Sequence, residues 1–412
     1  MNKTVLLQFS GPDQPGLIAV LTRLLADYNA CILDIGQSVI HETLVLGLLV
    51  EIAPEKLADF QNAMTTRSQD LDLRLSITPI NAEELEHWIA SQGKDRVIVT
   101  VLGRAISAEQ LARVSSIIAE HGLNVNRIER LSGRRSLAVH TSSSNACIEL
   151  RASGNAVAEA SMRAAFLAAA NDLRIDIAFQ RESIFRRNRR LFAFDMDSTL
   201  IQGEVIDELA KMAGVADKVV AITESAMRGE IEFQESFRRR VGLLRGLPEE
   251  KVLELLGSIP LVAGAEQLIS TLKMLGYKTA ILSGGFNFFA RHLQQQLGID
   301  YAYANELDIA DGKVTGEVSS EIVDGARKAA LLREIAAREN ISLEQVVAVG
   351  DGANDLPMLG IAGMGIAFRA KPIVRQTAGN AVSYLGLDSL LYLIGVRERD
   401  LARPAAAAPS QG

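Results

Sequence analysis

The N-terminal half of the chain repeats one pattern of apolar and polar positions. In the first copy, an apolar run at 5–9 precedes apolar residues at helical spacing over 17–28, and strand-like runs follow at 32–40 and 43–52. The second copy is offset by roughly 93 residues and has segments at 97–102, 108–121, 124–130, 136–141, 147–151 and 156–170. We predict two β-α-β-β-α-β modules, each a small ferredoxin-like sheet with two helices on one face.

The pattern changes after Glu182. Short apolar runs at 191–194, 279–282 and 346–349 alternate there with long helical stretches, which is typical of a doubly wound parallel α/β sheet. Residues 201–251 are mostly helical in pattern and predict a cap over the site. The predicted domains are 1–90, 91–182 and 183–400, followed by a disordered tail at 401–412.

Composition narrows the class of protein. The 412 residues carry a formal net charge of −7, whereas nucleic-acid binders carry a basic patch. The short basic cluster of Arg186, Arg187, Arg189 and Arg190 is interpreted as a solvated linker. No uncharged apolar run approaches the ~18 residues of a membrane span. We therefore expect a cytoplasmic protein that binds neither nucleic acid nor membrane.

The chain has two cysteines, Cys31 and Cys147, far apart and without CxxC spacing. This spacing supports neither a disulfide framework nor a thiolate metal site. We expect both side chains to be buried as small apolar residues.

Polar residues follow three predicted strands of the parallel sheet. The first strand runs into Asp195 and Asp197, the second into Ser283-Gly-Gly, and the third into Asp351. Ligands of open parallel sheets bind outside the carboxyl ends of the strands. Two carboxylates one residue apart can share a site, and a hydroxyl beside approachable backbone amides suits phosphate oxygens. The three motifs together predict a phosphate site at this edge.

Each motif alone has a simpler interpretation, because DxD and SGG sequences are more often turns than sites. Nucleotide-binding loops are not supported either. The chain has no GxxxxGK[ST] sequence, and Gly350-Asp-Gly352 lacks the third glycine of a dinucleotide fingerprint.

The motifs, in this order and with Lys328 about twenty residues before the last, resemble the haloacid dehalogenase superfamily of phosphotransferases. The resemblance implies that Asp195 is a nucleophile, which needs no prior deprotonation, and that Asp197 is the general acid and base. It implies that Ser283 and Lys328 neutralise the phosphoryl group. It also implies Mg²⁺ held by Asp195, the backbone carbonyl of Asp197 and Asp351, with Asp355 as support.

Further motifs over about 190–396 resemble the phosphoserine phosphatase family: Asp-Ser-Thr-Leu-Ile-Gln-Gly-Glu204, Ala226-Met227-Arg-Gly-Glu230, Arg238-Arg-Arg240, Ser283-Gly-Gly-Phe286 and Gly350-Asp-Gly-Ala-Asn-Asp355. The likeness implies that Glu204 binds the substrate ammonium and Arg240 its carboxylate. The other implied substrate contacts are Met227, Phe233, Ser283, Gly284, Lys328 and Asn354. Periodicity alone would place Arg240 on a helix surface.

The repeated N-terminal module resembles the ACT domain, most clearly at Gly11-Pro-Asp13-Gln-Pro15-Gly16-Leu. Two such domains before a phosphatase resemble a long form known from mycobacteria, in which L-serine can bind between ACT domains and inhibit. The resemblance implies effector contacts at Asp13, Gly16 and Gly103 and a homodimer, although the second copy departs from the motif after Gly103. Asp13 can equally be a helix N-cap, because Asp with Pro two residues later begins helices for local reasons.

Together these resemblances imply hydrolysis of O-phospho-L-serine to L-serine and phosphate, the last step of L-serine biosynthesis. One alternative is a related phosphatase acting on phosphohomoserine, phosphothreonine or phosphoprotein. A second alternative is an amino-acid sensor, which would show no Mg²⁺-dependent turnover.

Overall fold

The computed structural model describes residues 2–90, 94–134, 145–155 and 158–401. Its chain divides into two compact units, Met1–Lys94 and Asp95–Gly412. Residues 402–412 of the predicted tail lie outside the described residues. Within the described ranges, no helix has the length and apolar character that crossing a bilayer requires.

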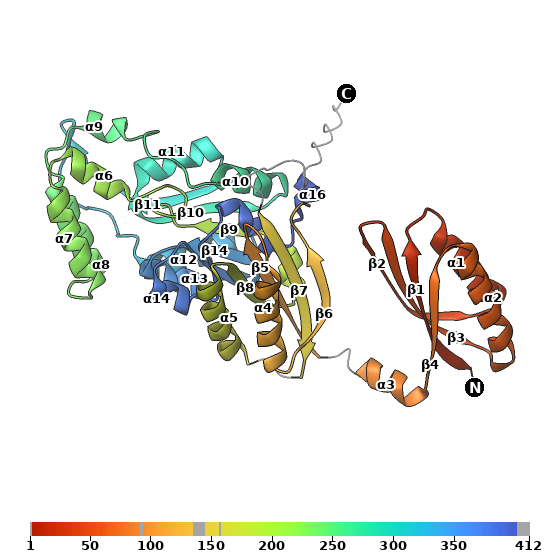
Figure 1. The fold of residues 1–412 in the computed structure, drawn as a ribbon. Helices are drawn as coiled ribbons and strands as arrows, with labels where there is room; N and C mark the ends of the chain where they lie inside the picture. The colour runs from red at the N-terminus through yellow and green to blue at the C-terminus, as the bar shows by residue number, and fades with distance from the viewer. Residues whose placement is uncertain (1, 91–93, 135–144, 156–157, 402–412) are drawn as a thin grey trace, which may run out of the picture. The chain divides into compact units, whose positions relative to one another are not determined.

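The first unit is a four-stranded antiparallel sheet with helices on one face (Figure 1). Its strands lie in the order β2-β3-β1-β4. Alternation along β1 and β3 turns Leu7 and Leu48 toward the helices, where they pack with Leu21 and Phe60. The predicted β-α-β-β-α-β order is confirmed by β1 (Lys3–Pro12), α1 (Leu17–Asp27), β2 (Cys31–Ile40), β3 (Thr43–Ile52), α2 (Leu57–Asp70) and β4 (Arg74–Ile80), followed by α3 (Ala82–Ala90).

Two local expectations about this unit are wrong. The N-cap of α1 is Gly16, at a φ of 92°, and no side chain caps the helix, so Asp13 is not its N-cap. Cys31 is exposed, whereas Cys147 is buried as expected. Cys31 begins the edge strand β2, in which every residue is exposed, and periodicity does not distinguish an edge strand from a central one.

The second unit begins with another antiparallel sheet, in the order β6-β7-β5-β8. Residues 147–151 of the predicted second module lie in β7, whereas the predicted strand at 136–141 lies outside the described residues. Its elements are β5 (Asp95–Gly103), α4 (Ala108–Glu120), β6 (Asn124–Arg130), β7 (Ala146–Gly154), α5 (Glu159–Leu173) and β8 (Asp176–Arg181).

A six-stranded parallel sheet follows in the same unit, in the order β11-β10-β9-β14-β15-β16. Leu191 and Ala193 of β9 pack with α12 and α13, and Phe192 and Phe194 pack with α10 and α11 on the other face. The predicted doubly wound sheet is therefore confirmed. Its strands are β9 (Leu191–Phe194), β10 (Lys278–Phe286), β11 (Tyr301–Asn305), β14 (Val346–Gly350), β15 (Met364–Phe368) and β16 (Asn380–Val382).

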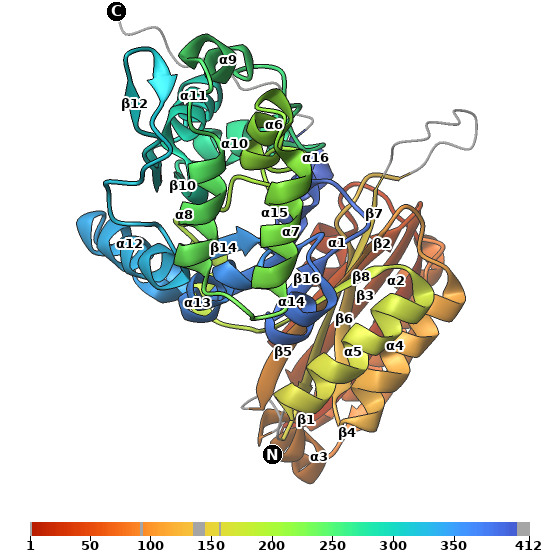
Figure 2. The same ribbon diagram turned by 90° about the vertical axis from the view of Figure 1, so that its left-hand side faces the viewer.

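Helices flank this sheet and fill the insertion after β9 (Figures 1 and 2). Those flanking it are α10 (Ala265–Met274), α11 (Asn287–Leu297), α12 (Gly325–Arg338), α13 (Leu356–Ile361) and α14 (Pro372–Thr377). Those of the insertion, which we call the cap helices, are α6 (Val205–Met212), α7 (Ala216–Met227), α8 (Phe233–Leu243) and α9 (Glu249–Glu254). The hairpin β12 (Ile309–Ala310) and β13 (Lys313–Val314) and the short helices α15 (Leu390–Leu393) and α16 (Glu398–Leu401) complete the described chain.

The second module and the parallel sheet are joined through their edge strands β8 and β16. Phe179 N donates to Asn380 Oδ1 at 2.9 Å. The buried Asp176 accepts hydrogen bonds from Ser383 N at 2.6 Å and Tyr384 N at 3.0 Å. These contacts tie the backbone of one domain to side chains of the other.

The expectation of a solvated basic linker is wrong for two of its four arginines. Arg186 is 3% exposed and forms a buried ion pair with Glu149 of the second module. Arg189 is also buried and donates to backbone carbonyls of Glu344 and Gly363. Their partners lie far away in sequence, so a local charge run does not reveal them.

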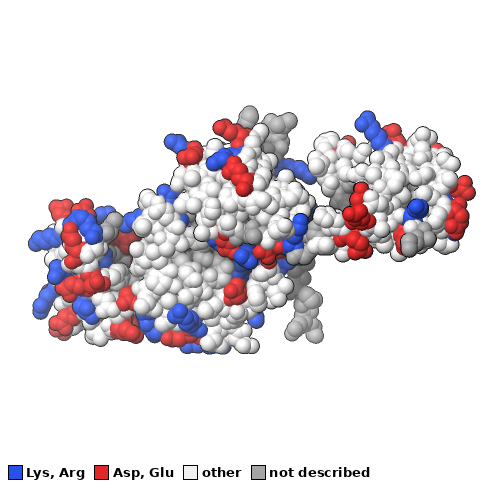
Figure 3. Space-filling model, turned by 90° about the horizontal axis from the view of Figure 1, so that it is seen from below, with Lys and Arg blue, Asp and Glu red and all other residues white. Residues whose placement is uncertain are grey.

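Acidic and basic residues are interspersed on the face that Figure 3 shows. The face in Figure 3 shows both signs side by side, without a broad basic area among its described residues. This arrangement agrees with the negative net charge and gives that face no phosphate-backbone footprint.

Candidate active site

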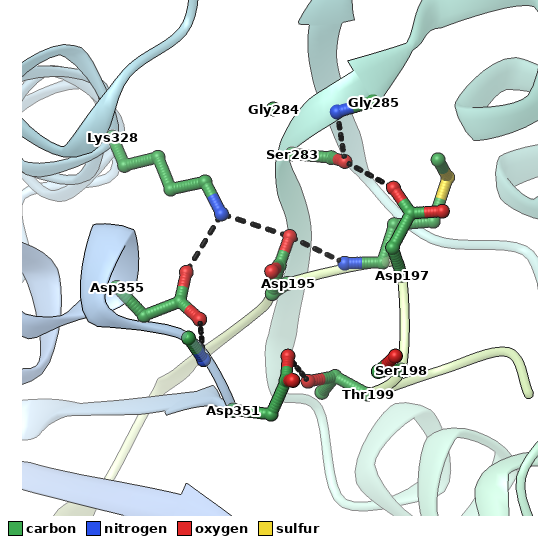
Figure 4. A network of polar contacts seen from close by, with 12 residues as sticks. Asp195, Asp197, Ser198, Thr199, Ser283, Gly284, Gly285, Lys328, Asp351 and Asp355 are labelled. Atoms are coloured by element: carbon green, nitrogen blue, oxygen red, sulfur yellow. Dashed lines mark hydrogen bonds and ion pairs between the residues drawn. The ribbon is translucent and has the colours of Figure 1, made fainter. Parts of the chain in front are cut away.

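Three neighbouring strands of the parallel sheet end at one edge. β9 lies between β10 and β14, so the polar residues near their carboxyl ends meet above that edge. Figure 4 shows Asp195, Ser283 and Asp351 gathered there, with Lys328 reaching in from α12. The structure thus brings together residues that lie far apart in sequence.

Asp195 is held by a buried lysine. Its Oδ1 is 2.8 Å from Lys328 Nζ and accepts a hydrogen bond of 2.8 Å from Met196 N. Lys328 is fully buried and also contacts Asp355 Oδ1 at 2.7 Å. Asp355 is itself fixed, because its Oδ2 accepts a hydrogen bond from Gly352 N at 2.9 Å. Both contacts to Asp195 fall on Oδ1, so Oδ2 is the oxygen that remains available to react with a bound substrate.

Asp197 lies beside the Ser283 turn. Its Oδ1 accepts a hydrogen bond from Val205 N at 2.8 Å, and its Oδ2 lies 3.4 Å from Ser283 Oγ, which donates to it. Ser283 Oγ in turn accepts from Gly285 N at 2.8 Å. A Cβ at Gly285 would come within 2.3 Å of Asp197 Oδ2, so this turn requires glycine.

Burial and neighbouring charges shift the pKa values of these groups. Burial, and then the charge of Asp355, raise the pKa of Asp195 well above its usual range, and Lys328 opposes the rise. Burial, and then Glu204, raise the pKa of Asp197 to about 8. Burial disfavours the charged form of Lys328, but Asp195 and Asp355 outweigh it and raise the lysine pKa. The ion pair with Lys328 favours the carboxylate form of Asp195 against the rise in its pKa. A protonated Asp197 beside an ionised Asp195 would divide the roles of acid and nucleophile.

Three carboxylates form a group suited to a cation. One oxygen each from Asp195, Asp351 and Asp355 lies within 4.8 Å of the others. Burial, and then Asp355, raise the pKa of Asp351 to about 7, and Thr199 Oγ1 donates to Asp351 Oδ1 at 3.3 Å. A bound cation would relieve the repulsion among these acids. The all-oxygen donor set fits a hard divalent metal ion.

A pocket of about 750 Å³ connects these carboxylates with the cap helices. Glu204, Phe233 and Arg240 line its cap side. Arg240 Nε is buried without a hydrogen-bond partner among the described residues, and burial lowers the arginine pKa although Glu204 and Asp207 favour its charge. The pocket thus combines a carboxylate and a forked cation with the group of catalytic aspartates.

Of the other predicted substrate contacts, the structure places two in the pocket and does not describe the side chain of a third. Gly284 and Asn354 line the same pocket. A Cβ at Gly284 would lie 3.0 Å from Phe233 Cζ, so the aromatic ring packs on this backbone. The side chain of Met227 lies outside the described residues.

Three residues of the site were not anticipated from the sequence. Thr199 holds Asp351, and Ser198 Oγ donates to Glu204 Oε1 at 3.3 Å from a backbone with φ of 55°. Asp207 lines the pocket from α6. It follows Glu204 by three residues, and this helical spacing was a usable signal.

The predicted effector residues are divided between the two units. Asp13 and Gly16 lie between β1 and α1, and Asp13 N donates to Glu42 O at 2.8 Å. Gly103 ends β5 opposite Ala146. A Cβ at Gly103 would lie 3.0 Å from Ala105 O, so close backbone packing alone favours glycine there.

Comparison with protein families finds three matching models. Residues 189–363 match the haloacid dehalogenase-like hydrolases. Residues 3–78 and 96–180 each match an ACT domain model. The three matches cover the parallel-sheet domain and the two antiparallel modules.

Two relatives align with nearly the whole chain. The chain is 41% identical to a Streptomyces coelicolor protein named phosphoserine phosphatase, over 97% of this chain and 93% of the relative. It is 37% identical to phosphoserine phosphatase SerB2 of Mycobacterium tuberculosis, over 97% of this chain and 94% of that protein. Among solved structures, an HAD family hydrolase from Salmonella enterica serovar Typhi aligns with a TM-score of 0.61 at 31% identity, covering 73% of this chain and 99% of that one.

Proposed function

The chain belongs to the phosphoserine phosphatase family of haloacid dehalogenase-like hydrolases, and on that premise we propose that it hydrolyses O-phospho-L-serine to L-serine and phosphate. The observation that carries the proposal is one pocket that contains both kinds of charged group. Asp195, which pairs with the buried Lys328, lines this pocket together with Glu204 and Arg240. An amino-acid phosphate has complementary charged groups at both of its ends.

In the proposed first step, Asp195 Oδ2 attacks phosphorus and the bond from phosphorus to the serine oxygen breaks. Asp197 donates its proton to the leaving alkoxide. Lys328, the Ser283 hydroxyl and the Gly284 backbone stabilise the charge on the phosphoryl oxygens. The product of this step is a phosphoaspartyl group on Asp195 and free L-serine.

In the second step, water attacks phosphorus and the bond to Asp195 breaks. Asp197, now a carboxylate, accepts the proton from that water. Phosphate leaves and both aspartates return to their starting forms. The hydrogen bond of 3.4 Å from Ser283 Oγ to Asp197 Oδ2 would keep the acid beside the phosphoryl group in both steps.

We propose Mg²⁺ as the metal of the acidic group, held by Asp195, the backbone carbonyl of Asp197 and Asp351, with Asp355 as support. Bound there, it would neutralise charge on the phosphoryl oxygens. The clustered carboxylates of Asp195, Asp351 and Asp355 and their mutual repulsion support this assignment.

For the substrate, we propose that Glu204 binds the ammonium and Arg240 the carboxylate, with Phe233 and Met227 as apolar walls and Asn354 beside the phosphate. The unpartnered Nε of Arg240 supports a ligand carboxylate at that position. Free amino-acid phosphates are thereby favoured over phosphopeptides, in which an amide replaces the ammonium.

We propose regulation by L-serine at Asp13, Gly16 and Gly103, and a homodimer formed through the ACT sheets. Exposed apolar residues on the first unit's sheet support association, because Ile35, Ile40 and Val45 are each at least half exposed. Light scattering that shows a monomer at micromolar concentration would contradict the dimer.

The domain boundaries and the location also remain proposals. We propose an ACT domain at 1–90, a second at 91–182 and the phosphatase domain at 183–400 with its cap at 201–251. We propose a cytoplasmic location, which the exposed free thiol of Cys31 supports, because reducing compartments keep such thiols unpaired.

The function is tested by phosphate release from a panel of substrates with Mg²⁺. We expect free O-phospho-L-serine to be hydrolysed faster than phosphothreonine, phosphohomoserine and a phosphoserine peptide, and chelation to abolish turnover. Glu204→Gln is the matched probe, because it should narrow the preference for the free amino acid over the peptide. A preference of the unmodified protein for the peptide would contradict the substrate proposal and leave the phosphoaspartyl chemistry standing.

A further inference from the structure

A second cavity lies between the second ACT module and the parallel sheet. Its volume is about 680 Å³, within the range of small-molecule sites. α5 and β8 line one side, and α14 and the segment through β16 line the other (Figure 2). None of its lining residues takes part in the proposed mechanism.

Two arginines line this cavity, and they differ in their partners. Arg163 is satisfied: it donates to the carbonyls of Phe179 and Gly379 and pairs with Glu159 at 3.6 Å. Arg375 donates to Asn171 Oδ1 at 2.9 Å, and its Nε is buried without a partner among the described residues. Arg375 therefore has donors left for a ligand.

The nearest acid does not neutralise Arg375 by direct contact. Asp176 also lines the cavity, and its charge interacts with that of Arg375. Both Asp176 oxygens, however, are taken by backbone N–H groups of Ser383 and Tyr384. Among the described residues Arg375 makes no ion pair, so an anionic group of a ligand can supply the negative charge that pairs with its guanidinium.

The remaining walls are mostly apolar. Phe166, Leu167, Ile177 and Phe179 contribute to them. A ligand that fills the cavity must therefore combine an anionic group for Arg375 with an apolar body. A planar carboxylate matches the forked guanidinium.

Helix α14 links this cavity to the catalytic pocket. Ile373 and Val374 line the catalytic pocket, and the next two residues, Arg375 and Gln376, line the second cavity. A ligand that binds Arg375 would move or fix α14. This helix of six residues also forms a wall of the catalytic pocket.

We propose that the cavity between α5 and α14 is a second ligand site, which binds a small molecule with a carboxylate on an apolar body through Arg375. A ligand bound in this cavity alters the catalytic pocket through α14, which lines both. The site is separate from the proposed effector residues Asp13, Gly16 and Gly103.

Binding is tested with phenylacetate as the probe and phenylacetamide as its uncharged match, by ligand-observed NMR on the full chain. We expect phenylacetate to bind about tenfold more tightly than the amide. Arg375→Gln should remove this difference, and Arg375→Lys should keep part of it. Ala160→Trp fills the rim of the cavity from an exposed helix position and should block binding without touching Arg375.

Two controls separate this site from the others. Phosphate at a concentration that fills the catalytic pocket should leave phenylacetate bound, and Asp13→Ala should not weaken it. Displacement by phosphate, equal binding of the amide, or full binding by both Arg375→Gln and Ala160→Trp would overturn the proposal. Thermal melting establishes that each variant is folded.

The link through α14 has its own readout. Saturating phenylacetate should change KM for O-phospho-L-serine by about fivefold in the unmodified protein and leave Ala160→Trp unchanged. Binding without any change in KM or kcat would overturn the link. Failure of both readouts in a protein that still hydrolyses O-phospho-L-serine would overturn this proposal alone and leave the proposed function intact.

Discussion

Lys328 is the cation on which the catalytic carboxylates depend. Among the described residues it makes the ion pairs of both Asp195 and Asp355. Lys328→Met would leave these acids buried without a counter-charge, so Asp195 should protonate and cease to be a nucleophile. We predict a loss of about 10²–10³ in kcat.

The control is Lys251→Met, which removes an exposed lysine paired with Glu254 on α9. Its kcat should match that of the unmodified protein. Lys328→Met with kcat within about threefold of normal would contradict the role given to the buried pair.

Asp197 is predicted to act in both chemical steps, and Asp197→Asn tests this with two leaving groups. With O-phospho-L-serine we expect a loss of about 10²–10⁴ in kcat. With p-nitrophenyl phosphate, whose leaving group needs no proton, the first step should survive and the second should not. A rapid burst of p-nitrophenolate, stoichiometric with enzyme and followed by little turnover, is the expected result. Steady turnover without a burst would contradict it.

Some single residues of the site could be assigned from sequence patterns, and others could not. Asp195, Asp197, Ser283 and Asp351 were predictable, because apolar runs place them after strands of one sheet. Arg240 was assigned from resemblance alone, since its helix periodicity favours the surface. Its burial depends on α6 and the acids it carries, which no local pattern contains.

At the scale of elements, Asn305 ties three parts of the site together. It is fully buried at the end of β11. Its Nδ2 donates to Gly284 O at 2.8 Å, and its Oδ1 accepts from Val323 N at 2.7 Å. The residue thus joins the Ser283 turn to the segment that begins α12, the helix of Lys328.

We predict that Asn305→Ala costs about 2–4 kcal/mol of unfolding free energy, because the Gly284 carbonyl and the Val323 amide lose their partner. The kcat of this variant should fall more than its KM rises, because the Ser283 turn and α12, which carries Lys328, would no longer be held in fixed positions relative to each other. Urea unfolding and steady-state kinetics measure both effects. Gln295→Ala, at an exposed position of α11, is the control, and equal stability of the two variants would contradict the prediction.

Elements were the level at which the sequence predicted most. Periodicity identified both modules and the parallel sheet, because each strand alternates or is wholly apolar and each helix has one apolar face. It could not predict that every residue of β2 is exposed. Exposure of an edge strand depends on which strands flank it, and the strand's own pattern is the same in either case.

At the scale of the whole molecule, Asp176 couples the second module to the parallel sheet. Burial raises its pKa to about 6, against the pull of the Ser383 and Tyr384 amides. The folded state therefore retains this proton at pH values where the unfolded chain has lost it. The stabilisation from the proton is complete below about pH 4 and is lost as pH rises through about 6.

Asp176→Asn should remove this dependence. The difference in unfolding free energy between the unmodified protein and the variant should change by about 3 kcal/mol between pH 4 and 7, in the direction that favours the unmodified protein at low pH. Urea unfolding across this range measures the difference. Parallel curves would show that Asp176 does not titrate at this interface.

The joining of these domains was hidden from sequence analysis. Arg186 appears in the sequence as part of a basic linker, but it pairs with Glu149 from a strand of the preceding module. Such contacts join segments that neither periodicity nor motif spacing relates. The sequence predicted the list of domains, and the three-dimensional structure was needed to show that two of them form one unit.

The central claim is that Asp195 carries the phosphoryl group during turnover. The most direct test is to quench the reaction with O-phospho-L-serine rapidly in acid, reduce the acyl phosphate with borohydride, and map the chain by mass spectrometry. The account predicts homoserine at position 195 in the unmodified protein with O-phospho-L-serine, more of it in Asp197→Asn when p-nitrophenyl phosphate is the substrate, and none in Asp195→Asn with either substrate. Unmodified aspartate at position 195 in the trapped Asp197→Asn protein, or full turnover by Asp195→Asn, would contradict the account.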